Sequence, residues 1–175
     1  MVCQTQSVNA EGNEMPNAIT MLKSDHVAVK RLLRELEETG DRATKQRERL
    51  VGEIERELKI HAQLEEELFY PTFKKVAEDT EAEDLFYEAT EEHHVVDMVL
   101  PEIDKDEVGS PEFAAKAKVL KDLVEHHAGE EEKEMFPRAR KLMDKGELQT
   151  LGEQLARRKE ELKAAGSGGD EDEED

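Results

Sequence analysis

HAQLEEELFYP, at residues 61–71, is matched later in the chain by HAGEEEKEMFP, at residues 127–137. Each stretch begins with a histidine, has a glutamate four residues later and reaches a proline ten residues after the histidine. Residues four apart lie on one side of a helix, so the His and the Glu can direct a nitrogen and an oxygen to one point. A pair of this kind suits a metal ion.

The repeat extends to the helix before each stretch, because Asp25-His26 in the first half matches Glu92-His93 in the second. The spacing from histidine to histidine is 35 residues in the first half and 34 in the second. Two such halves, facing each other about an approximate twofold axis, would bring four histidines and two glutamates to one place. We predict a two-metal site with the ligands His26, His61, Glu65, His93, His127 and Glu131.

A single histidine on a core-facing stripe is more often a hydrogen-bonded core residue than a metal ligand. Taken together, the six residues do not fit that interpretation. Burial of ionised carboxylates without a cationic partner costs several kcal/mol, so a metal centre is the better hypothesis.

Two of these assignments have an alternative. His126 also has a glutamate four residues later, Glu130, and His94 stands next to His93. The alignment of the two prolines selects His127 over His126, and the alignment of the apolar residues selects His93. On the sequence alone, the alternative that His126 and Glu130 are the metal ligands, in place of His127 and Glu131, remains open.

Four long amphipathic segments and one more polar segment are separated by glycine, proline or polar clusters. They predict helices at residues 18–38, 42–77, 80–104 and 111–143, with a fifth at residues 145–164. Ser110-Pro111 is a good helix start, with Ser as the cap and Pro in the first turn. Short connections favour an all-α fold, an antiparallel up-down-up-down four-helix bundle with an additional C-terminal helix.

Composition predicts one domain with tails. We expect a flexible N-terminal arm at residues 1–16, the bundle at residues 17–143, the extra helix at residues 144–165 and a disordered Gly-rich and acidic tail at residues 166–175. The chain has 45 acidic and 25 basic residues and a net charge of −20. This charge repels phosphates and argues against a nucleic-acid partner.

Cysteine usage and hydropathy bear on the compartment. Cys3 is the single cysteine, so an intramolecular disulfide is impossible and a reducing environment fits. The sequence has no run of about 18 apolar residues and no signal-peptide pattern at its start. We therefore expect a cytoplasmic protein without a membrane partner.

With these residues in place, the sequence resembles the hemerythrin-like HHE cation-binding domain family over roughly residues 17–143. The resemblance implies a non-haem di-iron centre that is bridged by Glu65, Glu131 and an oxo or hydroxo group, with histidines on each iron. Imidazole and carboxylate ligands also suit Mn or Zn as substitutes. Ferritin-like bundles differ, since they use Glu-x-x-His pairs and more carboxylates.

One position departs from the oxygen-carrying members of that family. Their third helix supplies two histidines one turn apart, whereas the residue one turn beyond His93 is Asp97. One iron would then hold Asp97, a water molecule or an open position. The difference in charge and access argues against simple reversible oxygen carriage.

The resemblance implies that the centre binds O₂, nitric oxide or peroxide at an open iron position, for sensing, scavenging or protection against oxidative and nitrosative stress. An enzymatic form would consume peroxide or nitric oxide. The alternative is an iron-responsive or iron-holding interaction module without turnover, and a third hypothesis is a structural bundle without metal. The sequence identifies no protein partner and no electron donor.

The aromatic and sulfur-containing neighbours of the candidate ligands indicate their roles less clearly. Core packing is the favoured role for Phe69 and Met135, over the alternative that they wall a ligand pocket. Surface or rim packing is favoured for Tyr70 and Tyr87, over hydrogen bonding near the metal.

Acidic neighbours are interpreted in the same way. Asp25 and Glu92 precede candidate ligands, and a solvated helix face is favoured over hydrogen bonds to the ligand histidines. Glu66 and Glu132 follow the candidate bridging glutamates, are turned by about 100° around the helix and are expected to be exposed.

Overall fold

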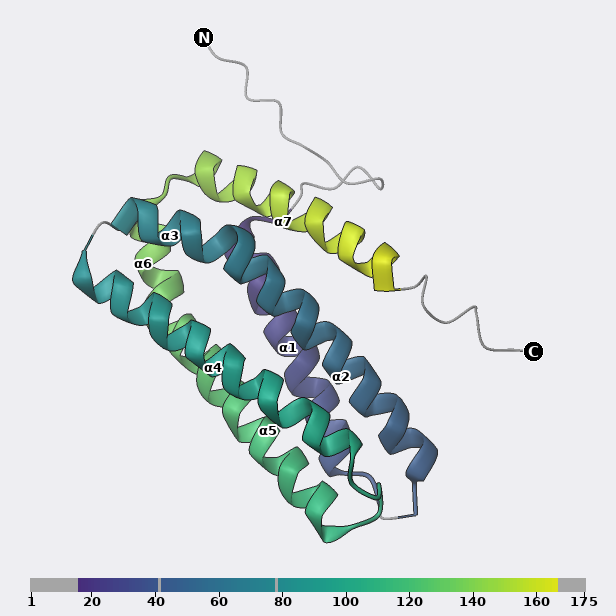
Figure 1. Ribbon diagram of the computed structural model, residues 1–175. Coiled ribbons are helices and arrows are strands. Elements are labelled where there is room, and N and C mark those ends of the chain that lie inside the picture. Colours follow the sequence, from purple (N-terminus) through teal and green to yellow (C-terminus); the bar gives the residue numbers. More distant parts are fainter. Residues whose placement is uncertain (1–15, 41, 78, 167–175) are drawn as a thin grey trace.

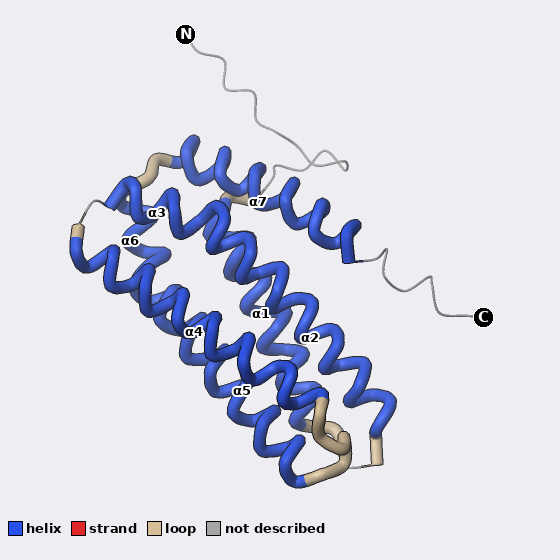
Figure 2. The backbone as a smooth tube through the Cα atoms, in the orientation of Figure 1, coloured by secondary structure: helices blue, strands red, loops and turns tan. Residues whose placement is uncertain are grey.

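The computed structural model describes residues 16–40, 42–77 and 79–166. Cys3, the predicted arm up to residue 15 and the predicted acidic tail after residue 166 lie outside the described residues. Every regular element in the described ranges is helical, as Figure 2 shows.

The helices form five rods (Figure 1), two of which contain a wide π-helical turn. The elements are α1 (Ala18–Glu37), α2 (Thr44–Leu64), η1 (Glu65–Phe69), α3 (Tyr70–Ala77), α4 (Thr80–Asp104), α5 (Pro111–Glu130), η2 (Glu131–Met135), α6 (Phe136–Leu142) and α7 (Lys145–Gly166). The rods α2–η1–α3 and α5–η2–α6 are each continuous and pack with α1 and α4 into an antiparallel bundle. The predicted all-helical fold with an additional C-terminal helix is confirmed.

Polar side chains cap the start of three of the rods. The side chain of Asn17 accepts a hydrogen bond from the backbone N–H of Thr20, and Asp79 accepts one from Ala82. Ser110 accepts one from the backbone N–H of Phe113, directly before Pro111. Each cap satisfies a backbone donor that a helix start leaves unpaired. The helix start predicted at Ser110 is confirmed.

The repeated prolines coincide with the two wide turns. The backbone N–H of Tyr70, directly before Pro71, reaches the carbonyl of Glu65 five residues back, and Phe136 before Pro137 reaches Glu131. A proline ring lacks an N–H and collides with the carbonyl four residues earlier in a regular helix. A π turn relaxes this position and lets the helix continue. The predicted helices 42–77 and 111–143 are therefore continuous, with one extra residue inserted in each.

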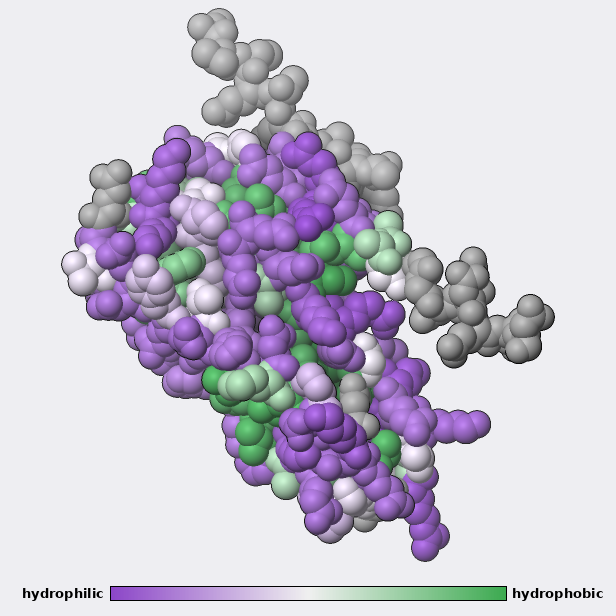
Figure 3. Space-filling view, in the orientation of Figure 1, coloured by the Kyte–Doolittle hydropathy of each residue, from purple (hydrophilic) through white to green (hydrophobic). Residues whose placement is uncertain are grey.

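Two apolar clusters fill the interior, one on each side of a layer of histidines. One cluster includes Val29, Leu33, Leu50, Ile54, Leu100, Phe113 and Leu120. The other includes Ile19, Leu22, Phe69, Phe73, Phe136, Leu151 and Leu155. The face drawn in Figure 3 is largely hydrophilic, with patches of hydrophobic side chains among the hydrophilic ones. No helix in the described ranges has the length and apolar content needed to cross a membrane.

The C-terminal helix α7 packs on α1, α2 and η1 and lies away from α4 and α5 (Figure 1). Its buried face carries Leu148, Leu151 and Leu155. Gly152 lies on the same face, against the backbone at the start of α1. A Cβ atom at this position would lie 2.5 Å from the carbonyl oxygen of Pro16 and 2.8 Å from the nitrogen of Ala18. The close approach of α7 therefore requires glycine.

This contact predicts opposite effects of two glycine substitutions. Gly152→Ala should lower the free energy of unfolding by about 2 kcal/mol, because the new methyl group meets backbone atoms that cannot rotate away. Gly52→Ala, in the exposed middle of α2 where a Cβ meets nothing within 4 Å, should raise it by about 0.5–1 kcal/mol. Urea unfolding of both variants checks the pair. Stabilisation by Gly152→Ala would contradict the proposed contact.

Candidate metal centre

Four helical rods each direct one histidine into the middle of the bundle. His26 comes from α1, His61 from α2, His93 from α4 and His127 from α5, and all four side chains are buried. Glu65 and Glu131 are the first residues of η1 and η2, and both are buried as well. The structure thus brings the six predicted residues into one layer.

The first group of converging ligand atoms joins His26, His61, Glu65 and Glu131. The Nε2 atoms of His26 and His61 lie 3.0 Å apart. His26 Nε2 lies 3.2 Å from Glu131 Oε2, and His61 Nε2 lies 3.2 Å from Glu65 Oε1. Each histidine of this pair therefore has its own carboxylate oxygen beside it.

The second group joins His93, His127 and Glu65. The two Nε2 atoms lie 3.1 Å apart, and His93 Nε2 lies 3.4 Å from Glu65 Oε2. His127 Nε2 lies 3.7 Å from Glu131 Oε2, the oxygen that also faces His26. Glu65 thus presents one oxygen to each histidine pair, and Glu131 lies between the pairs.

These residues fit two metal ions. Two nitrogens that bind one ion at about 2.1 Å and a right angle lie about 3 Å apart, which is the spacing in both histidine pairs. Glu65 Oε1 and both carboxylate oxygens of Glu131 are buried without a hydrogen-bond partner. Buried carboxylate oxygens ordinarily have partners, and cations would complete this donor set. The protein contains a buried His/Glu cluster that is consistent with a dimetal site.

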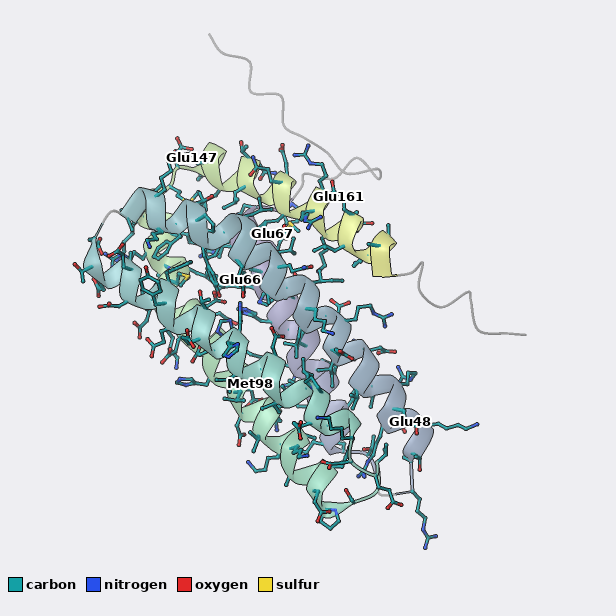
Figure 4. All side chains as sticks on the ribbon, viewed as in Figure 1. Glu48, Glu66, Glu67, Met98, Glu147 and Glu161 are labelled. Carbon is teal, nitrogen blue, oxygen red and sulfur yellow. The ribbon has the colours of Figure 1, made fainter. Side chains whose placement is uncertain are left out.

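The outward-facing nitrogens of three histidines donate to carboxylates from other rods. His26 Nδ1 lies 3.0 Å from Glu132, His93 Nδ1 lies 2.8 Å from Glu66, and His127 Nδ1 lies 2.8 Å from Glu92. Figure 4 shows Glu66 between the α2–α3 rod and α4. Such bonds fix the ring and direct Nε2 toward a metal.

The fourth outer carboxylate is Asp25, whose Oδ2 faces His61 Nδ1 at 3.8 Å. Its other oxygen accepts from Lys159 of α7. Burial by itself raises the pKa of the Asp25 carboxyl, but the neighbouring His61 and Lys159 outweigh this effect and lower it. Asp25 is therefore an anion that holds α7 against the centre.

These contacts correct the predictions for the acidic neighbours. The solvated helix face favoured for Asp25 and Glu92 was wrong, because packing of adjacent rods places each beside a histidine of the following helix. Glu66 is exposed, as predicted, whereas Glu132 is partly buried, and the hydrogen bonds of these two residues to His93 and His26 were missed. The Glu-Glu pair in both copies of the repeat was the signal that pointed to them.

Tyr70 is fully buried, so its predicted place at the surface or rim was wrong. The π turn brings it inward beside Phe69, and its hydroxyl donates to Glu65 Oε2 at 3.3 Å. Its ring stacks on His93, just as Phe136 stacks on His26 in the other half. Burial raises the pKa of the phenol well above its usual value, and the charges of Glu65 and Glu131 raise it further. Tyr70 therefore keeps its proton.

The remaining predicted neighbours lie outside both groups. Phe69 and Met135 pack in the core, as favoured, and Tyr87 is exposed. His94 and Asp97 are exposed on α4, and neither belongs to the converging groups. Asp97 does contribute to the lining of a cavity beside the histidines.

That cavity has a volume of about 30 Å³ and contacts all four histidines. It lies on the side opposite Phe69, and most of its other lining is apolar: Val29, Leu58, Ala62, Val96, Val124 and Ala128. A water molecule needs at least about 10 Å³ of such space. The cavity therefore has room for a molecule of very few atoms next to the candidate metal ligands.

Comparison with known proteins agrees with this geometry. A family model described as the hemerythrin HHE cation binding domain matches residues 17–139. The crystal structure of a hemerythrin HHE cation binding domain-containing protein from Mycobacterium kansasii, an Rv2633c homolog, is 31% identical with a TM-score of 0.75. The match covers 86% of this chain and 90% of that one.

Two sequence relatives differ in length. The chain is 28% identical over 150 residues to "Uncharacterized protein Rv2633c" of Mycobacterium tuberculosis, which covers 85% of this chain and 89% of the relative. It is also 28% identical over 120 residues to a DNA nickase of Nostoc, covering 69% of this chain. The chain spans only about a third, 32%, of that nickase.

The electrostatics of the centre predict the pH dependence of the metal-free protein. Burial by itself lowers the pKa of both His93 and His127. The carboxylates of Glu65, Glu66 and Glu92 outweigh this effect and raise the pKa of His93 to about 9 and that of His127 to about 10. The stabilisation from these raised values is complete below the unfolded pKa of about 6.5 and is lost as the pH rises through 9 to 10.

We therefore expect the metal-free protein to lose several kcal/mol of unfolding free energy between pH 6.5 and pH 10. Urea unfolding after removal of metal with a chelator measures this loss. Metal-loaded protein is the control and should not show the decline, because metal binding displaces the ring protons. A metal-free protein that becomes more stable over this range would contradict the assignment.

Proposed function

Because the chain belongs to the hemerythrin HHE cation-binding domain family, we propose that its buried histidines and glutamates hold two iron ions and that this centre binds O₂, nitric oxide or peroxide. The observation that carries the proposal is the small apolar cavity against the four histidines. Its size admits a diatomic molecule or peroxide and excludes a bulky substrate.

The choice of iron rests on the family. Imidazole and carboxylate suit iron, manganese and zinc, and the usual order of affinities favours zinc over ferrous iron in a test tube. Bound iron would supply electrons and Lewis acidity to the small ligand. In this proposal Glu65 and Glu131 would hold the two ions together with the four histidines, while the outer carboxylates hold the imidazole rings.

Other residues control protons and access. Tyr70 keeps its phenolic proton inside the buried centre, with its hydroxyl oxygen 3.3 Å from Glu65 Oε2. On the opposite side, the apolar wall formed by Val96 and Val124 keeps the ligand cavity poor in water. Asp97 is exposed and borders the same cavity, so we place it at the route from solvent. Scavenging, sensing or protection by peroxide or nitric-oxide consumption are functions that this arrangement supports.

Elemental analysis and a visible spectrum test the centre. Protein purified from its own cells should contain two irons per chain and an oxo-bridge charge-transfer band that changes on addition of nitric oxide or peroxide. Two irons with a spectrum that none of these ligands changes would instead favour an iron-holding module without turnover. Protein that carries no metal from its own cells would contradict both.

The bridging role of Glu131 predicts a loss of metal. Glu131→Ala should retain at most one of the two ions, because it removes a carboxylate that faces both histidine pairs. Glu134→Ala, an exposed change in the same π turn, should retain both. Metal analysis of the two purified variants makes the comparison, and full retention in Glu131→Ala would mean that Glu131 is not a ligand.

The cavity predicts the effect of a single methylene group. Val124→Leu adds a group that fills much of the 30 Å³ cavity and should slow nitric-oxide binding about tenfold without changing metal content. Val119→Leu is the matched control, since Val119 is half exposed on the same helix. Stopped-flow absorption measures both rates. An unchanged rate in Val124→Leu would place ligand binding elsewhere.

A further inference from the structure

A second cluster of metal-ligating side chains lies at the surface between α4 and α5. His126 Nε2 is 3.3 Å from Glu92 Oε1 and 3.4 Å from Glu130 Oε1, and the three ligand atoms all lie within 4.8 Å of one another. His126 is 61% exposed in its side chain, so solvent ions reach it. None of these three residues belongs to the two buried groups.

The surface cluster is in direct contact with the buried centre. Glu92 uses one oxygen toward His126, and the other accepts the hydrogen bond from His127 Nδ1 at 2.8 Å. A small cavity of about 10 Å³ is lined by Glu92 and Glu130 at its outer side and by Glu131 at its inner side. Both oxygens of Glu131 are buried and have no hydrogen-bond partner. Glu131, whose carboxylate oxygens accept no hydrogen bond, therefore lies behind the cluster, on the inner side of this cavity.

The internal repeat supplies a comparison for these positions. Glu92 corresponds to Asp25 in the first half, and Asp25 has an ammonium partner, Lys159 of α7. The positions matching His126 and Glu130 are Ile60 and Leu64, which are buried in the apolar core.

The second half differs because α7 packs on α1 and α2 (Figure 1). The ion pairs that the structure places on Glu92 and Glu130 are with histidines. In the first half, Asp25 therefore pairs with a lysine, and the two matching helix positions are apolar. In the second half, those two positions hold His126 and Glu130, which lie beside Glu92.

We propose that Glu92, His126 and Glu130 form a third divalent-metal site, which receives ions from solvent and passes them to the buried centre. One imidazole nitrogen and two carboxylate oxygens suit Fe²⁺, Mn²⁺, Co²⁺ or Zn²⁺, with water in the remaining positions. Three ligands on an exposed surface bind weakly, which favours transfer. The existence of this surface site goes beyond the proposed function. Its role in loading the buried centre rests on the proposed function.

Equilibrium dialysis of the metal-free full chain against Co²⁺ tests the site. Wild type should bind three ions per chain, and the double variant His126→Ala, Glu130→Gln should bind two. The control is His94→Ala, Glu91→Gln, the same pair of residue types in exposed positions on α4, which should bind three. Two bound ions in wild type, or three in the double variant, would overturn the third site.

The kinetics of Co²⁺ uptake test the loading role. Stopped-flow absorption should show that the buried centre fills about tenfold more slowly in the double variant than in wild type, because a local anionic site raises the encounter rate. The buried centre of the double variant should still reach two bound ions. Equal filling rates would overturn the loading role. A wild type that binds a single ion, which the double variant loses, would support the surface site and contradict the buried dimetal centre.

Discussion

Two carboxylates, Glu65 and Glu131, are withdrawn from water in the middle of a helical bundle, with no hydrogen-bond donor on Glu131 and four imidazoles around the pair. Ionised groups in such surroundings are costly unless positive charge faces them. Protonated histidines can supply that charge in the metal-free protein, and two metal ions would supply it with better geometry. The same requirement explains why an apolar cluster closes the layer on each side, since the interactions at the centre are strengthened where water is excluded.

Duplication of one helical unit solves the problem of placing the ligands. Each half contributes a carboxylate at the first residue of a π turn and an adjacent glutamate that holds a histidine of the other half, as Glu66 does for His93. The proline that follows explains the turn, and the turn moves the next aromatic residue inward. The same local sequence pattern, present in both halves, therefore places both the candidate ligands and the glutamates that orient the histidines.

The differences between the halves carry the specific chemistry. Tyr70 brings a phenol to one end of the centre, whereas its counterpart Phe136 brings a bare ring to the other. The helix α7 covers the first half and provides Lys159 to Asp25, whereas Glu92 in the second half faces His126 at the surface. The approximate twofold axis thus holds for the six central residues and fails in the layer around them, where we place the proposed routes for ions and small ligands.

The sequence by itself determined the helices, their order and the six residues that converge, because HxxxE spacing, the aligned prolines and the apolar periods are local patterns. It could not place Tyr70, since a π turn shifts the helical phase that the pattern assumes. Nor could it assign Asp25 and Glu92 to histidines of other helices, or show that Gly152 lets α7 approach α1. Those contacts depend on the rotation and separation of whole helices, which are set by packing between distant segments and decided only in the tertiary structure.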